Sequence, residues 1–199
     1  METGRLTAPG VVYEGELVNG KADGKGKMTF EDGAIWEGVF VKGKQRKGKI
    51  YFPDGDVYES DDIYEDPEKR GIGKGKMTFT NGDVYEGAFV AFKPHGKGKM
   101  TFEGGSVYEG DFVDGKWIGN SGETRKGKWT DPNGDIYEGD WVDNCAHGRG
   151  KFTYANGDVY EGEFKDHKPH GKGKKTYKDG KVEEGKWKKG EYKGKGLFG

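Results

Sequence analysis

Residues 160–173 read YEGEFKDHKPHGKG, and residues 177–180 complete the same phrase with YKDG. Its opening, an aromatic residue followed by Glu and then in most copies by Gly, recurs along the chain at spacings of 22 to 29 residues. A short period of this kind indicates small structural units that stack on their neighbours. The copies begin at Tyr13, Trp36, Tyr58, Tyr85, Tyr108, Tyr137 and Tyr160, and an eroded copy begins at Glu183.

Each unit has the features of a β-hairpin. The aromatic strand leads through a polar tip into a Gly-Lys-Gly-Lys strand, as at residues 73–76, and then into an Asn-Gly or Asp-Gly pair, as at Asn156-Gly157. Such pairs suit a type I′ turn, because both of its central residues need positive φ. We therefore predict a two-stranded hairpin in each unit, with type I′ turns at these pairs.

Alternation along each strand predicts a sheet with two unlike faces. Tyr85, Gly87 and Phe89 share one face, and Glu86 lies on the other. The lysines of the second strand also lie on the Glu face, so that Glu and Lys of adjacent strands pair. Each exposed pair contributes a few tenths to about 1 kcal/mol. This matching explains how a chain with 35% charged residues has a net charge of only -1.

The composition favours a single layer over a two-sided globular core. The 199 residues include 39 glycines, 31% are hydrophobic, and the mean hydropathy is -1.02. Aromatic residues make up 14% and follow the repeat, which argues against disorder. No apolar run approaches the ~20 residues of a membrane span, no secretion signal begins the chain, and the lone Cys145 allows no internal disulfide. We expect a soluble, cytoplasmic protein.

From about Gly4 to Gly199 the chain resembles the MORN (membrane occupation and recognition nexus) repeat, most fully at residues 160–180. The resemblance implies an all-β fold, an elongated, twisted single-layer antiparallel sheet of stacked hairpins with a concave aromatic groove. It also implies a scaffold in cytoskeletal, ciliary or membrane-contact assemblies. We interpret residues 1–199 as a single array, with a partial repeat at 1–12, repeats starting near 13, 36, 58, 85, 108, 137 and 160, and a degenerate terminal repeat at 183–199.

The predicted function is that of a non-catalytic adaptor whose aromatic groove receives a helix or an extended segment of a partner protein. Exposed, contiguous apolar surface usually marks an interaction site, and Tyr and Trp are preferred anchors there. The alternative is that the rings only pack over glycines of adjacent units; we expect them to do both. The groove residues are Tyr85, Phe89, Tyr108, Phe112, Tyr137, Trp141, Tyr160 and Phe164.

Two other functions remain open. Lys186, Lys188 and Lys189 lie in a basic C-terminal stretch that would favour an anionic membrane by ~1 kcal/mol per Lys, which makes a phosphoinositide-dependent tether the second hypothesis. A regulatory subunit of an enzyme complex is the third. The sequence pI of about 6.5 argues against nucleic acid as a partner. Both termini fall inside a unit, and we expect any homodimer to use the N-terminal edge or the groove.

Catalytic and metal sites are disfavoured, and no cofactor is expected. His95, His147 and His170 recur at one position of the unit, and neighbouring units lie roughly 9 to 10 Å apart, too far for shared metal coordination. Cys145 near His147 lacks a third orienting group. Residues 122–128 resemble a P-loop in letters only, because Trp129 follows. The insertions near 61–70 and 118–126 are interpreted as surface loops, either drifted or partner-specific.

Overall fold

The computed structural model describes residues 2–60, 71–116, 123–143 and 145–195. These residues form strands and turns and contain no helix, which confirms the all-β prediction. The chain divides into two compact units, residues 1–95 and residues 96–199.

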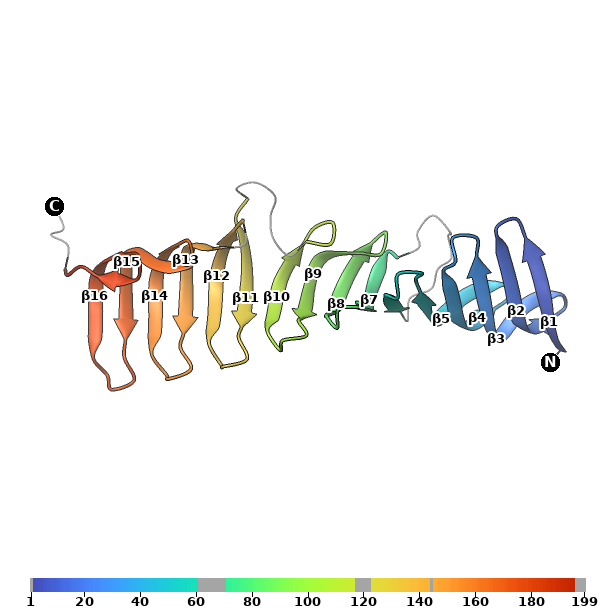
Figure 1. Ribbon diagram of the computed structural model, residues 1–199, viewed down its shortest axis with the longest axis horizontal. Helices are drawn as coiled ribbons and strands as arrows, with labels where there is room; N and C mark the ends of the chain where they lie inside the picture. The colour runs from blue at the N-terminus through green and yellow to red at the C-terminus, as the bar shows by residue number, and fades with distance from the viewer. Residues whose placement is uncertain (1, 61–70, 117–122, 144, 196–199) are drawn as a thin grey trace. The chain divides into compact units, whose positions relative to one another are not determined.

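The first unit is an antiparallel ladder in which each strand pairs with its neighbours in sequence (Figure 1). Its strands are β1 (Glu2–Ala8), β2 (Val11–Val18), β3 (Lys21–Phe30), β4 (Ile35–Val41), β5 (Lys44–Tyr51), β6 (Val57–Ser60), β7 (Gly73–Thr78) and β8 (Val84–Val90).

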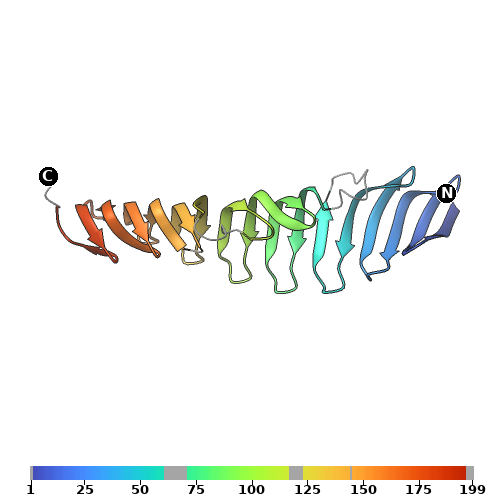
Figure 2. The same cartoon turned by 90° about the horizontal axis from the view of Figure 1, so that it is seen from above.

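The second unit repeats this arrangement from β9, a strand whose first three residues belong to the first unit. Its hairpins β12–β13 and β14–β15 stand side by side in both views (Figure 2). Its strands are β9 (Lys93–Thr101), β10 (Val107–Phe112), β11 (Arg125–Thr130), β12 (Ile136–Val142), β13 (Cys145–Thr153), β14 (Val159–Lys165), β15 (Lys168–Thr176), β16 (Val182–Lys188) and β17 (Glu191–Tyr192).

The register of paired strands places the glycines of one strand opposite those of the next, and Glu opposite Lys. In β14–β15, Gly162 lies opposite Gly173 and Glu161 opposite Lys174. Ion pairs join adjacent strands on the charged face: the Lys49 Nζ to Glu59 Oε1 distance is 2.6 Å. The predicted Glu–Lys pairing is therefore confirmed. These pairs are largely exposed, so their main contribution is to register and solubility.

The core is a tyrosine ring lying on a pair of glycines. Tyr160 is fully buried, and a Cβ atom added at Gly173 would lie 2.1 Å from its Oη. That distance is far inside contact, so only glycine fits beneath the ring. The Tyr160 hydroxyl donates to the Glu163 carbonyl at 3.0 Å, and burial raises the pKa of Tyr160 to about 12. Tyr13, Tyr85 and Tyr137 make the same bond to the carbonyl three residues ahead.

A second ring, four residues after the tyrosine, joins one repeat to the next. The Phe164 ring packs edge-on against Tyr160 of its own repeat at 5.1 Å and against Tyr137 of the preceding repeat at 4.9 Å. Trp141 bridges Tyr137 and Tyr108 in the same way. Each edge-to-face pair adds about 0.5–1.5 kcal/mol beyond the apolar area it buries. Stacking between repeats therefore depends on this second ring.

The Asn-Gly and Asp-Gly turns differ from the prediction. Gly157 has a φ of 92°, but Asn156 does not have positive φ. The Gly157 N–H donates to the Tyr154 carbonyl and the Tyr154 N–H to the Asp158 carbonyl, both at 2.9 Å. This is a three-residue loop with a type I turn and a left-handed glycine. The type I′ prediction at these pairs is wrong, because Asn156 Oδ1 accepts a bond from the Asp158 N–H and holds the type I form.

Type I′ geometry occurs at the opposite end of the hairpins. Both central residues have positive φ at Asn19-Gly20, with values of 51° and 71°. The same holds at Asp166-His167, with values of 51° and 65°, although neither residue is glycine. These tips connect each aromatic strand to the following lysine strand.

Replacement of Gly173 by Ala should destabilise the fold, because the new methyl group would overlap the Tyr160 ring. We expect a loss of about 2–3 kcal/mol in the free energy of unfolding, as overpacked cores show. Gly104 is the matched control, since a Cβ there meets nothing within 4 Å and its φ is not positive. Urea unfolding of Gly173→Ala and Gly104→Ala compares the two, and equal midpoints would contradict the ring-on-glycine core.

Candidate functional site

The eight aromatic residues predicted to line a groove lie in the core. Tyr85, Tyr108, Phe112 and Tyr160 are fully buried, and none of the eight exposes more than 5% of its surface. The expectation that the outer edges of these rings stay open to a partner is not met, because the rings cover one another across repeats. Contact of these residues with a partner stays a prediction, and the structure assigns them to packing.

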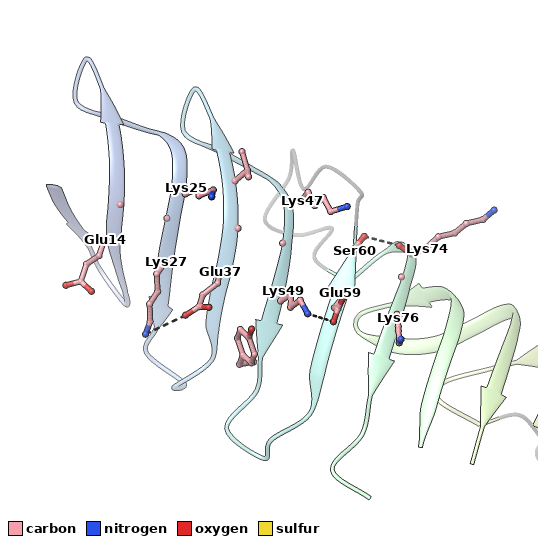
Figure 3. A pocket seen from close by; sticks show the side chains of 17 residues that line it. Glu14, Lys25, Lys27, Glu37, Lys47, Lys49, Glu59, Ser60, Lys74 and Lys76 are labelled. Carbon is pink, nitrogen blue, oxygen red and sulfur yellow. Dashed lines mark hydrogen bonds and ion pairs between the residues drawn. The ribbon is translucent and has the colours of Figure 1, made fainter. Parts of the chain in front are cut away.

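A groove of about 1040 Å³ opens in the first unit, across β2 to β7 (Figure 3). It lies on the charged face, opposite the aromatic rings. Five glycines form its floor, and Cβ atoms added to Gly26 or Gly48 would point away from the groove into the Tyr13 or Trp36 ring. The floor is therefore bare backbone. The glycines are Gly15, Gly26, Gly38, Gly48 and Gly75.

Lysine and glutamate side chains form the walls of the groove in alternate strands. The Lys27 Nζ to Glu37 Oε1 distance is 3.8 Å, and Lys49 pairs with Glu59. Among the described residues that line the groove, lysines outnumber glutamates six to three. The lysines are Lys25, Lys27, Lys47, Lys49, Lys74 and Lys76, and the glutamates are Glu14, Glu37 and Glu59.

The residue after each Glu-Gly pair differs from repeat to repeat. In the second unit this position holds a carboxylate: Lys126 Nζ lies 2.8 Å from Asp140, and Lys97 Nζ lies 2.8 Å from Asp111. In the first unit this position varies: Glu16 Oε2 accepts from the Lys25 N–H at 2.8 Å, whereas Val39 lies opposite Lys25 and Ala88 opposite Lys74. This variation can be read in the sequence, as Gly-Val-Phe and Gly-Ala-Phe in place of Gly-Asp-Phe.

Two apolar side chains also reach solvent in the groove. Val39 exposes 39% of its surface and Tyr51 exposes 38%. An exposed aromatic beside lysines and bare backbone gives the groove both apolar and ionic contacts.

The histidines and Cys145 lie at positions that serve the fold. The Tyr137 and Tyr160 hydroxyls lie 3.4 Å from the carbonyl oxygens of His147 and His170, so this position of the repeat serves the core through its backbone. Cys145 begins β13 and is half-buried. Across the described residues, no group of three or more His, Cys, Asp or Glu side chains could hold a metal ion.

The lysines of the membrane hypothesis are exposed. Lys186 and Lys188 lie on the charged face of β16, and Lys189 follows in a turn with a φ of 54°. Lys186 lies opposite Lys172 on β15, which concentrates positive charge there. No helix among the described residues is long and apolar enough to cross a membrane. The insertion near 61–70 lies outside the described residues, and the one near 118–126 is described only from residue 123.

The model of the MORN-repeat family matches eight segments that together cover most of the chain. The chain belongs to the MORN-repeat family. The matched segments are residues 13–35, 36–57, 73–84, 85–107, 108–117, 137–159, 160–182 and 184–198. The interpretation of residues 1–199 as one uninterrupted MORN array stays a prediction.

Solved structures with a similar fold include two domains of other proteins. One is the TCP domain of SAS-4 (dCPAP) of Drosophila melanogaster, in complex with a proline-rich motif of Ana2 (dSTIL), with a TM-score of 0.53, 14% identity, and coverage of 94% of this chain and 90% of that domain. The other is the G-box domain of the microcephaly protein CPAP, with a TM-score of 0.53, 15% identity, and coverage of 94% and 100%. At this identity the likeness shows the fold alone. No curated protein matches the MORN chain.

Asp140 illustrates what the carboxylate after Glu-Gly does in a MORN hairpin. Its Oδ2 accepts from the Arg149 N–H at 2.9 Å, at the bulge where the register of β12–β13 shifts. Desolvation alone would raise the pKa of Asp140, but the bonds from Lys126 and Arg149 outweigh it and hold the pKa below its usual value. The ionised form therefore caps the bulge.

Replacement of Asp140 by Asn should reduce stability by about 1 kcal/mol at pH 7. Since the folded-state pKa is lowered, this stabilisation is present above the unfolded-state value of ~3.9 and is lost as the pH falls through the folded-state value. The loss of stability caused by Asp140→Asn should therefore be smaller at acidic pH. Glu138→Gln, which removes an exposed carboxylate 3.9 Å from Lys128, is the control and should cost less than ~0.5 kcal/mol. Urea unfolding at pH 7 and pH 3 measures both variants, and a deficit independent of pH would count against the charged cap.

Proposed function

We propose that this MORN-repeat chain is a non-catalytic scaffold that binds a segment of a partner protein in the groove of residues 1–95. The observation that carries the proposal is the groove itself, which combines a bare glycine floor, walls of lysine and glutamate, and the exposed Tyr51. A floor without side chains lets the backbone of a ligand approach the sheet closely. Binding of a segment, not chemistry, is what such a surface can do.

The fold supports this function. The SAS-4 domain, which shares the fold, was solved with a proline-rich motif of another protein bound to it. The work on the CPAP domain suggests a role for that protein in centriole elongation. We place the present scaffold in a cytoskeletal or ciliary assembly of the cytoplasm. The buried aromatics, such as Tyr137 and Trp141, support binding by holding the sheet rigid.

A membrane tether is the second candidate function, favoured by the exposed Lys186, Lys188 and Lys189. Polybasic segments gain ~1 kcal/mol per Lys near an anionic leaflet. The third candidate, a regulatory subunit, uses the same groove but adds a catalytic partner. A homodimer through the N-terminal edge or the aromatic groove also stays a prediction.

A photo-crosslinking amino acid at Tyr51 tests the scaffold function in cells that express the full chain. We expect it to capture one defined protein, and the same amino acid at Val90, which is also exposed but lies outside the groove, should not. Charge reversal of Lys25 and Lys49 should reduce the Tyr51 product at least tenfold, because these lysines line the groove. Loss of the product on reversal of Lys186, Lys188 and Lys189 instead, with membrane release, would favour the tether and defeat the scaffold.

A further inference from the structure

The charged face of the first unit carries a row of residues whose charge alternates in sign. The row crosses β1 to β8, and each member lies opposite the next in the register of the paired strands. Figure 3 shows its part from β2 to β7, with the ion pairs Lys27–Glu37 and Lys49–Glu59. We call this set the alternating row; in strand order it consists of Arg5, Glu14, Lys27, Glu37, Lys49, Glu59, Lys76 and Glu86.

The alternating row is complementary to its own reverse, because it has an even number of members. A two-fold axis parallel to the strands, placed between β4 and β5, sets β4 of one copy against β5 of another copy, and β1 against β8. Glu37 then meets Lys49 of the second copy, and Lys27 meets Glu59 of the second copy. Every member of the row therefore faces a residue of the opposite charge.

We propose that the charged face of residues 1–95 binds a second copy of this chain, in a two-fold dimer with the alternating rows face to face. Two β-sheets that pack face to face keep their strands within about 30° of each other, which is the arrangement that this axis produces. The inference goes beyond the proposed function and does not depend on it. The contact uses neither the N-terminal edge nor the aromatic rings.

The charges of the alternating row keep their neighbours within the chain when the dimer forms. The Lys49 Nζ to Glu59 Oε1 distance is 2.6 Å, and the Arg5 Nε to Glu14 Oε1 distance is 3.7 Å. Each of these charges gains an opposite charge from the second copy and loses none of its own contacts. Burial of a lone charge is what makes ionic interfaces costly, and no member of the row is left alone.

The row beside the alternating row holds β-branched residues and Tyr51. Tyr51 stands between Ile35 and Val57 on this face and exposes 38% of its surface. About the same axis, Ile35 of one copy meets Tyr51 of the other, and aromatic residues are enriched in protein interfaces. This row gives the contact an apolar centre. Its members are Thr7, Val12, Thr29, Ile35, Tyr51, Val57, Thr78 and Val84.

Exposed apolar side chains distinguish the first unit from the second. Val18, Val39 and Val41 lie on the charged face of β2 and β4 and expose 37–43% of their surface. Charge also alternates in the second unit, where Glu109 lies opposite Lys128. Across the described part of that unit, however, Val182 is the one large apolar side chain that is exposed. Concentrated apolar surface marks an interaction site, so we assign the dimer contact to the first unit.

The face is large enough for a stable contact. Strands β1 to β8, spaced at about 4.8 Å, span roughly 34 Å. On β4 the side-chain rows run from Ile35 to Val41, which is roughly 20 Å at about 3.3 Å per residue. The flat area is therefore about 700 Å², close to the ~800 Å² per partner that a standard interface buries.

The charges nearer the hairpin tips are engaged within the chain and do not set the register of the dimer. Glu16 Oε2 accepts from the Lys25 N–H at 2.8 Å, and Lys47 and Lys74 have contacts of their own. The same axis sets Glu16 on β2 against Lys74 on β7 of the second copy, which agrees with the alternating row. Asp61 lies outside the described residues and has no part in the contact.

The dimer would control access to the groove. The second copy covers the glycine floor between β2 and β7, which is the surface that the proposed function assigns to a partner segment. A segment therefore binds only to the separated chain, and dimerisation competes with it by mass action.

Sedimentation velocity of the full chain at increasing concentrations tests the proposal through a charge swap. We expect a monomer–dimer equilibrium for the wild-type chain. Glu37→Lys alone and Lys49→Glu alone should each weaken the dimer by about tenfold or more, because each sets like charges against one another on both sides of the axis. An equimolar mixture of the two variants should restore the dimer, since each changed residue then faces an opposite charge. Tyr51→Thr should also weaken the wild-type dimer.

Glu109→Lys and Lys128→Glu are the matched controls at the same positions of the second unit, and both should dimerise as the wild type does. Circular dichroism checks that each variant is folded. A wild-type chain that is monomeric at every concentration would overturn the proposal. So would a dimer that survives both single variants, or a mixture that stays monomeric. The scaffold function is judged separately, by capture of a different protein at Tyr51.

Discussion

A tyrosine ring lying on two paired glycines is the contact on which the described hairpins depend. In β14–β15 the ring of Tyr160 occupies the space that side chains at Gly162 and Gly173 would need, and its hydroxyl bonds to the backbone of its own strand. The next ring, Phe164, can then insert between Tyr160 and Tyr137. A core of this kind needs few aliphatic residues, which explains how so polar a chain folds.

The same contact produces the charged groove. The rings occupy the space where glycine side chains would lie on one face of the sheet. On the other face these glycines expose only backbone. Lys and Glu then stand as walls on either side of that floor. Val39, at the position after Glu-Gly, makes this wall partly apolar. The groove is therefore a consequence of the core, and the residue after Glu-Gly changes its walls from one repeat to the next.

Much of this fold could be predicted from the sequence, since period, alternation and the Glu–Lys match determine the hairpins and their register. The turn types could not be predicted, because a glycine with positive φ suits both a type I′ turn and a type I turn followed by a bulge. The hydrogen bond of the Asn156 side chain selects the second form. Burial of the rings also escaped prediction. Alternation along the strand predicts on which face of the sheet Phe164 lies. Its position between two tyrosines depends on the stacking of neighbouring repeats.

Proton NMR of the glycine Hα atoms measures the central contact directly. At Gly162 and Gly173 the Hα that occupies the Cβ position lies against Tyr160, and the other Hα does not. The account predicts a strong upfield ring-current shift for the first Hα only, and its loss in Tyr160→Leu, which keeps an apolar side chain there. Two Hα atoms with similar, unshifted resonances at both glycines in the wild-type chain would contradict it.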